Sequence, residues 1–262
     1  MADRAQVTDT PYVMYLVLNV NRLTDVRVRR ALVLATDTQG YRTAIGGPRA
    51  TGRALSLVSP TVPGYRPNPA FTGPPQGDPV AARRLLRAAG VRTPYPINFT
   101  YPGRELAADK AAAALKEGWG RAGFEVRLDP LGAEYFDAVA SPDAPVDVAW
   151  GAWGADWPSI STVLPPLFNS RVNLTEESNG QDLGNYRSGR VNHLLDRAAA
   201  VDDLAEQVSI YQRVDARLGR DAAYIPLLLR RAWLLRGSAV RGYVLAPGYG
   251  APGLGAIGVA RD

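Results

Sequence analysis

The apolar run from Tyr12 to Val20 constrains the fold more strongly than any other part of the sequence. It is rich in Val, Leu and Tyr, and it is apolar at nearly every position. A run of this length with strand-forming residues predicts a buried β-strand. After it, Thr24 can cap a helix that carries apolar residues at spacings of three and four as far as Ala35.

Strand and helix patterns alternate through most of the remaining chain. The pair Asp78-Pro79 predicts the start of a helix, because an aspartate caps free N–H groups and a proline fits the first helical position. Gly90 predicts the end of that helix. Further strands are predicted at 97–101, 124–128, 146–150, 224–229 and 233–235, and further helices at 105–122, 191–198 and 204–218. This alternation, with short connections, predicts an α/β fold.

Two segments lack any regular pattern. Residues 46–77 are rich in proline and glycine, so we expect an ordered loop that wraps the surface. A loop of this length is unusual in a compact domain and points to a function or a partner surface. The tail, residues 242–262, contains six glycines and two prolines, and we expect it to need another surface to pack against.

The charge pattern argues against a nucleic-acid partner. The net charge is +5, but the basic residues are mostly scattered arginines, apart from pairs such as Arg29-Arg30, Arg83-Arg84 and Arg230-Arg231. A nucleic-acid interface would gather Lys and Arg on one face. The sequence also lacks a run of ~18 apolar residues that could span a membrane. It has no cysteine for a disulfide or a thiolate metal site.

Residues with the chemistry of catalysis are scarce. His193 is the only histidine, and no Gly-x-Ser-x-Gly elbow accompanies it, so a solvated or helix-capping role fits it better than a catalytic triad. No His, Asp and Glu cluster has zinc spacing, and no phosphate-binding loop motif is present. We therefore expect a protein that is not an enzyme and that has no metal or cofactor.

Residues 147–157 combine aromatic, small and acidic residues, and they contain Trp150, Trp153 and Trp157. Small residues allow a ligand or another backbone to approach closely. Aromatic faces beside the carboxylate of Asp156 can hold a cationic or amphipathic molecule. A core position fits Trp150 equally well. Ligand binding is favoured for Asp156, since a carboxylate at the end of an apolar strand needs a partner.

Several motifs, taken in order, resemble the C-terminal half of the family 5 extracellular solute-binding proteins, which include dipeptide- and oligopeptide-binding proteins. The most specific match is Leu18-Asn19 followed by Leu23-Thr24-Asp25-Val26-Arg27-Val28-Arg29-Arg30-Ala31-Leu32. The segment from Asp78 to Gly90 is similar to a family helix motif, and Trp153-Gly-Ala-Asp156 is similar to its Trp-x-x-Asp segment. Later matches are Asn185-Tyr186, Asn192, Leu195-Asp196, Tyr224-Ile-Pro226-Leu and Arg241-Gly242-Tyr243.

The resemblance implies a protein whose two lobes close on a ligand like a clamp. The expected fold class is the second lobe of a periplasmic-binding-protein-like fold (type II, cluster C), a mixed sheet flanked by helices, with short strips of the first lobe. Residues 1–19 would be the crossover segment from lobe I, residues 20–234 lobe II, and residues 235–262 the return to lobe I. The polar start of the chain fits either a cytosolic protein or a chain whose signal peptide and first lobe lie upstream, and the resemblance favours the second.

The resemblance also implies roles for individual residues. In peptide-binding members the acid of the Trp-x-x-Asp segment pairs with the α-amino group of the ligand, and Asp156 occupies that position here. Trp153 then fits the wall of the cleft, and Trp150 and Trp157 are further candidates for ligand contact. Arg104 lies near the place where some relatives contact a ligand carboxylate.

One departure from the family pattern keeps the ligand open. Many relatives have a second acid and a proline after the first acid, whereas this chain continues Trp157-Pro158-Ser159-Ile160. A preference for dipeptides is therefore not implied. Other members of the family bind nickel complexes, sugars or siderophore-like compounds.

The function implied by the resemblance is that of the substrate-binding component of an ABC importer for peptides or related small molecules. Its partners would be that ligand, an ABC permease in the membrane and the missing N-terminal lobe of the same protein. Its place would be outside the cytoplasm, in the periplasm or as a lipoprotein at the cell surface. The alternatives are an accessory hydrolase that uses His193 and a ligand-sensing or interaction domain derived from the same lobe.

Overall fold

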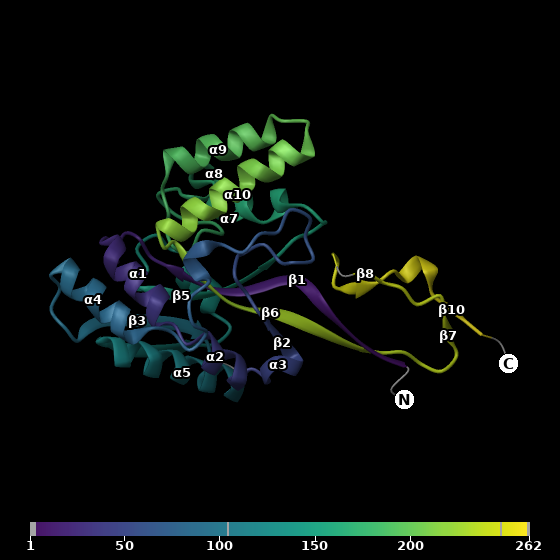
Figure 1. Ribbon diagram of the computed structural model, residues 1–262, viewed down its shortest axis with the longest axis horizontal. Helices are drawn as coiled ribbons and strands as arrows, with labels where there is room; N and C mark the ends of the chain where they lie inside the picture. Colours follow the sequence, from purple (N-terminus) through teal and green to yellow (C-terminus); the bar gives the residue numbers. More distant parts are fainter. Residues whose placement is uncertain (1–3, 104, 247, 261–262) are drawn as a thin grey trace.

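The computed structural model describes residues 4–103, 105–246 and 248–260. Its centre is a mixed sheet with the strand order β2-β6-β1-β5-β3-β4 (Figure 1). β3 runs parallel to β4 and β5, whereas β1 runs antiparallel to both of its neighbours, β5 and β6. The strands are β1 (Ala5–Leu18), β2 (Thr51–Arg53), β3 (Tyr95–Pro102), β4 (Phe124–Leu131), β5 (Val148–Gly154) and β6 (Tyr224–Leu235).

Helices cover both faces of this sheet (Figure 1). One face packs against α1 (Val26–Ala35), α2 (Thr38–Ala44), α4 (Pro79–Ala89) and α5 (Leu106–Ala122), and the other against α7 (Leu164–Phe168), α9 (Gly189–Ala199) and α10 (Leu204–Arg220). β1 supplies both cores, with Leu16 and Leu18 in the first and Tyr15 and Val17 in the second. Successive side chains of a strand point to opposite faces, so a strand covered on both sides must be apolar throughout. The apolar run at the start of the sequence is explained by this position.

The helix caps account for where the main helices begin and end. Asp78 accepts a hydrogen bond from the Ala81 N–H at 2.9 Å, Pro79 lies in the first turn, and Gly90 ends α4 in the left-handed conformation with φ of 71°. These features confirm the start and end predicted for α4. The predicted cap of α1 at Thr24 was wrong by one residue, because the side chain of Asp25 accepts the hydrogen bond from the Arg27 N–H at 2.8 Å.

Short elements complete the chain, and the sequence did not predict them. They are α3 (Gly47–Ala50), α6 (Tyr135–Val139), α8 (Ser170–Asn173), β7 (Val240–Arg241), β8 (Leu245–Ala246), β9 (Ala251–Pro252), β10 (Gly258–Val259) and the 3-10 turns Pro69–Phe71, Ile160–Thr162 and Leu254–Ala256. The helix α2 was also missed, because its seven residues are too few to show a clear period. Within the described residues, no helix has the length and apolar character needed to cross a membrane.

The strand β6 differs most from its prediction. The sequence indicated two short strands separated by Arg230-Arg231, but residues Tyr224–Leu235 form one continuous strand. Its first half is buried in the sheet, and its second half continues beside β1 as a two-stranded ribbon that extends past the helices (Figure 1). The arginines lie where the strand leaves the covered region, so polar side chains reach solvent without breaking the ladder.

The segment from Asn19 to Leu32, which is the most specific sequence motif, is structural. Arg29 is only 7% exposed, and its guanidinium donates hydrogen bonds to the carbonyl oxygens of Leu23 at 2.6 Å, Thr24 at 3.1 Å and Asp221 at 2.9 Å. These contacts join the turn after β1 to the residue that follows α10. The motif therefore fixes how the two helical layers meet at this end of the sheet.

A buried carboxylate holds the long loop over residues 54–77 against α10. Asp215 accepts hydrogen bonds from the hydroxyl of Tyr224 at 2.5 Å, the hydroxyl of Ser56 at 3.2 Å and the side-chain amide of Asn68 at 3.1 Å. Burial raises the pKa of Asp215 to about 6, while its donors act in the opposite direction. The loop is ordered by specific contacts, as predicted, but it is shorter than the predicted residues 46–77, because α3 and β2 occupy residues 47–53.

The C-terminal tail forms two small ribbons, β7 with β10 and β8 with β9. It leaves large apolar side chains in solvent, since Val244 is 60%, Leu254 77% and Val259 71% exposed. Figure 1 shows β7 and β10 beyond the far end of the ribbon of β1 and β6, whereas β8 turns back toward the body of the molecule. There Gly248 lies close to Pro158, and Gly250 lies close to Thr10 and Pro11.

We predict that replacing Arg29 by Leu lowers the free energy of unfolding by about 3 kcal/mol, because buried carbonyl oxygens lose charged hydrogen-bond donors. The replacement Arg84→Leu is a matched control, since Arg84 is an exposed helical arginine with no contact among those described. It should change the stability by less than about 0.5 kcal/mol. Urea denaturation followed by circular dichroism measures both, and equal stability of the two variants would contradict a structural role for Arg29.

Candidate functional site

The carboxyl ends of three strands meet at one edge of the sheet. β3, β4 and β5 run in the same direction, and they end at Pro102, Leu131 and Gly154. Open α/β sheets bind their ligands outside the carboxyl ends of the strands, where the loops can carry side chains without disturbing the core. At the same edge β1 and β6 leave the sheet as a ribbon, and Tyr12 of β1 lies opposite Gly154. We take this edge as the candidate site.

The tryptophans predicted to act together are separated by the strand. Trp150 and Trp153 are three residues apart on β5, and an odd separation places side chains on opposite faces of a strand. Trp150 donates its indole N–H to the Tyr41 hydroxyl at 3.2 Å on the side of the first core. Trp153 donates its indole N–H to the Thr162 carbonyl at 2.8 Å and packs on the second core. The structure therefore does not bring these two indoles together in one aromatic box.

Asp156 and Trp157 follow β5 directly and are both exposed. The Asp156 N–H donates to the Thr162 hydroxyl at 3.2 Å, which fixes the backbone of the turn. Its carboxylate has no hydrogen bond or ion pair with any described residue. Trp157 is 56% exposed, so its indole also presents a large apolar surface to solvent. These two side chains are available to a ligand or to another domain.

Glycines in β5 make room for tyrosines of β1. A Cβ atom added at Gly151 would lie 2.8 Å from the ring of Tyr15, and one added at Gly154 would overlap the ring of Tyr12. Each tyrosine ring therefore lies close against the backbone of the neighbouring strand. The small residues that suggested close approach of a ligand are used, in this part of the strand, for the approach of these rings. Tyr12 is 49% exposed and adds an aromatic side chain to the candidate site.

A cavity of about 490 Å³ opens beside the same edge, on the face that carries Trp150. Its volume lies in the range of roughly 300–1,000 Å³ that small-molecule sites occupy. Its walls come from β1, β3, β5, β6, α2 and α5. The lining residues that matter for its chemistry are Met14, Tyr41, Phe99, Tyr101, Trp150, Leu228, Glu105 and Arg230. Asp156 and Trp153 are not among the lining residues.

The tyrosines of this cavity keep their protons. Burial raises the pKa of Tyr41 to about 12, although the hydrogen bond from Trp150 lowers it slightly. Burial and the contact with Asp109 raise the pKa of Tyr101 to about 12, and the Tyr101 hydroxyl donates to the Asp109 carboxylate at 2.9 Å. Both hydroxyls are therefore neutral donors near pH 7.

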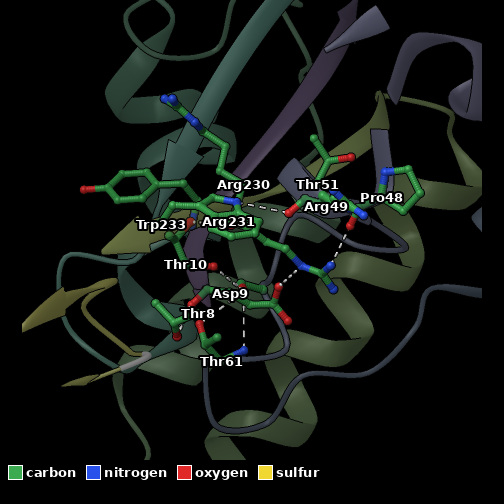
Figure 2. A network of polar contacts seen from close by, with 12 residues as sticks. Thr8, Asp9, Thr10, Pro48, Arg49, Thr51, Thr61, Arg230, Arg231 and Trp233 are labelled. Atoms are coloured by element: carbon green, nitrogen blue, oxygen red, sulfur yellow. Dashed lines mark hydrogen bonds and ion pairs between the residues drawn. The ribbon is translucent and has the colours of Figure 1, made fainter. Parts of the chain in front are cut away.

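Positive charge gathers where β6 leaves the sheet. Arg231 pairs with Asp9 at 2.8 Å and donates to the Pro48 carbonyl at 2.6 Å (Figure 2). The indole N–H of Trp233 donates to the Arg49 carbonyl at 3.2 Å, which ties the same strand to α3. Figure 2 shows Arg230 extending away from the pair of Asp9 and Arg231.

Two residues considered in the sequence analysis remain, Arg104 and His193. Arg104 lies outside the described residues. His193 is exposed on α9, on the layer that covers the other face of the sheet. Among the described residues, no group of three or more His, Asp or Glu side chains is placed to hold a metal ion.

Sequence reasoning missed Tyr12, Tyr41, Tyr101 and Arg230 as candidate residues. Their positions in strands and in a short helix gave no motif, and only the fold brings them to one edge. The apolar pattern around Tyr12 placed it in a strand, but it did not show that the strand projects past its neighbours at that residue.

A family model and curated proteins match this chain. The model of the bacterial extracellular solute-binding proteins, family 5 middle, matches residues 2–174. The chain is similar to the "Probable deoxycholate-binding periplasmic protein YgiS" of Escherichia coli (strain K12), with 28% identity over 210 residues, 78% of this chain and 37% of that protein. It is also similar to "Di/tripeptide-binding protein 4" of Pseudomonas aeruginosa (strain UCBPP-PA14), with 27% identity over 212 residues, 78% of this chain and 37% of that protein.

Solved structures share the fold. The structure titled "Clavulanic acid biosynthesis oligopeptide binding protein 2" aligns with a TM-score of 0.88 and 24% identity, over 98% of this chain and 48% of that one. The murein tripeptide binding protein MppA of Escherichia coli aligns with a TM-score of 0.80 and 18% identity, over 99% of this chain and 50% of that one. The chain thus spans about half the length of these proteins. The likeness confirms the predicted fold of a periplasmic binding protein.

We predict that Gly151→Ala lowers the free energy of unfolding by about 1–3 kcal/mol, because the added methyl group must displace the buried Tyr15 ring. Gly189→Ala is the control, since a Cβ at Gly189 meets nothing within 4 Å. Gly189 begins α9, so alanine there should leave the stability unchanged or raise it by up to about 1 kcal/mol. Thermal unfolding of both variants tests the prediction. A Gly151→Ala protein as stable as the control would show that Tyr15 can move without cost.

Proposed function

The chain belongs to the bacterial extracellular solute-binding proteins of family 5, and from this premise we propose that it forms the second lobe of the substrate-binding component of an ABC importer. The observation that carries the proposal is the position of Asp156. Its carboxylate follows a strand end at the ligand-binding edge of an α/β sheet, and it has no partner among the described residues. A charge in that position is suited to pair with a cationic group of a ligand.

The ribbon of β1 and β6 supports a hinge between two lobes. The pairing of these strands is interrupted between Asp9 and Val13, where the ribbon leaves the sheet. Irregular pairing bends a strand locally, and a few residues at the end of an element can absorb the rotation of a hinge. In our proposal residues 20–234 form lobe II, and residues 1–19 and 235–262 belong with lobe I.

Apolar side chains on the outer part of the ribbon support a covering lobe. Val7 is 44%, Trp233 58% and Leu235 67% exposed in this chain. Exposed apolar residues that cluster in this way mark surfaces that another part of a protein covers. The same reasoning applies to the tail, which has apolar residues in solvent at Leu254 and Val259.

The ligand in this proposal is a peptide or a related small molecule with a free amine. One relative is named as a deoxycholate-binding protein, and another is named as a di/tripeptide-binding protein. Asp156 would pair with the amine, and Trp153 and Trp157 would contact the ligand beside it. The family is one of binding proteins, and we propose that this chain binds and releases its ligand without changing it chemically. The partner would be a membrane permease, and the protein would work outside the cytoplasm, with or without a lipid anchor.

We predict that, in the protein with both lobes, Asp156→Asn weakens the binding of a peptide with a free α-amine by roughly 2–5 kcal/mol, because the amine loses its charged partner in a closed cleft. Asp143→Asn is the control, since Asp143 is an exposed acid away from this edge and should leave the affinity unchanged. An N-acetylated form of the same ligand should bind Asp156→Asn and the unmodified protein equally. Isothermal titration measures all of these affinities, and an unchanged affinity for the free amine would remove Asp156 from the site.

A second prediction tests the clamp itself. The 262-residue chain carries one wall of the cleft, so it should bind peptides far more weakly than the same chain joined to its first lobe. Titration of a peptide library into both proteins compares them. Tight binding by the single lobe, or none by the two-lobe protein, would contradict the proposed function.

A further inference from the structure

The cavity of about 490 Å³ between α2, α5 and the sheet is lined by aromatic, apolar and charged residues. It is formed entirely by this chain, and it is not lined by Asp156. An inference about what fills it rests on the proposed function, because it concerns a second part of the same ligand. Its apolar floor, the buried hydroxyl of Tyr41 and its charged rim each restrict the occupant.

The floor is apolar and aromatic. Phe99 and Leu228 are fully buried, and Tyr41, Trp150 and Met14 line the same cavity. Filling such a surface with an apolar group removes it from water, which stabilises the complex in proportion to the area covered. Alanines of α5, among them Ala108 and Ala112, leave the space open where larger residues would close it.

A buried hydroxyl in the wall has an unused proton. Tyr41 is 4% exposed, and its oxygen accepts the indole N–H of Trp150 at 3.2 Å. Its own O–H has no acceptor among the described residues. A buried donor without an acceptor costs free energy, so an acceptor atom on an occupant would stabilise the complex.

The rim is positively charged on the side of β6. Arg230 lines the cavity, is exposed, and its guanidinium has no partner among the described residues. Arg231 is already paired with Asp9, and Arg42 donates to the Thr51 carbonyl at 3.1 Å. Burial lowers the pKa of Arg42, and the nearby charges of Arg231 and Arg53 lower it further. Among the charged residues that line the cavity (Arg230, Arg231 and Glu105), Arg230 is the cation that no described acid pairs.

We infer that this cavity is a subsite for a large apolar group that carries a carboxylate, with the apolar group between Trp150, Tyr41 and Phe99 and the carboxylate against Arg230. Two kinds of molecule share this chemistry. One is a peptide whose last residue has a large apolar side chain, and the other is an organic acid with a ring system. The subsite lies within one lobe, so it can be tested on this chain directly.

The test uses two pairs of probes. The first pair is Ala-Ala-Trp and its C-terminal amide, and the second is 2-naphthylacetate and 2-naphthylacetamide. Binding is measured by NMR titration of the tryptophan indole N–H signals of the 262-residue chain, with the Trp150 signal assigned from Trp150→Phe. We expect each acid to shift the Trp150 signal and to bind about tenfold more tightly than its amide. If Ala-Ala-Trp binds more tightly, the subsite prefers a peptide; if 2-naphthylacetate binds more tightly, it prefers an organic acid with a ring system.

Two variants examine the two halves of the subsite. Ala108→Phe fills the cavity from α5, and it should abolish the shift of Trp150, whereas Ala113→Phe on the exposed side of α5 should not. Ala108→Leu serves if the larger residue prevents folding. Arg230→Gln should weaken the acids about tenfold and leave the amides unchanged, and the charge-matched control Arg84→Gln should change neither.

Several results would overturn the inference. They are equal affinity for acids and amides, binding that survives both fillers at Ala108, and acid binding that is insensitive to Arg230→Gln. These outcomes are distinct from failure of the proposed function. A two-lobe protein that binds peptides through Asp156 while the cavity variants have no effect would leave the clamp intact and remove only the subsite.

Discussion

The central position of β1 determines most of this structure. β1 pairs antiparallel with β5 on one side and β6 on the other, and its side chains alternate between two separate apolar cores. Both helical layers therefore pack against β1 and against its neighbours β5 and β6, which also place side chains in both cores. The same strand extends beyond the helices together with β6, so the element that holds the lobe together is also the one that leads out of it.

This arrangement places the candidate site where the regular sheet gives way to the ribbon of β1 and β6. The parallel strands end where β1 and β6 lose regular pairing, and Asp156, Tyr12 and Arg230 lie along that boundary. A ligand bound there would touch a rigid sheet edge and the start of the ribbon at once. In a clamp, such contacts let ligand binding favour the closed state, because closure brings the second wall onto the same ligand.

Most of the family motif residues have structural contacts. Arg29 and Asp25 position a turn and a helix cap, while Tyr186 donates its hydroxyl to the Asp221 carboxylate at 2.6 Å. Asp156 is the motif residue at the sheet edge whose charge has no partner within the described part of the chain. Resemblance at the motifs thus accounts for the fold, whereas the cavity residues Tyr41 and Arg230 lie outside the motifs.

The sequence by itself determined the buried strand, the capped helices α4 and α5, the α/β class and the family, because apolar period, cap residues and motif spacing are local properties. It also placed Asp156 after a strand. Only the tertiary structure decided that Trp150 and Trp153 face opposite cores, that Gly151 and Gly154 receive tyrosine rings, and that Tyr41, Trp150 and Arg230 surround one cavity. The glycine–tyrosine contacts and the cavity depend on strand pairing between residues far apart in the chain, which no local pattern encodes.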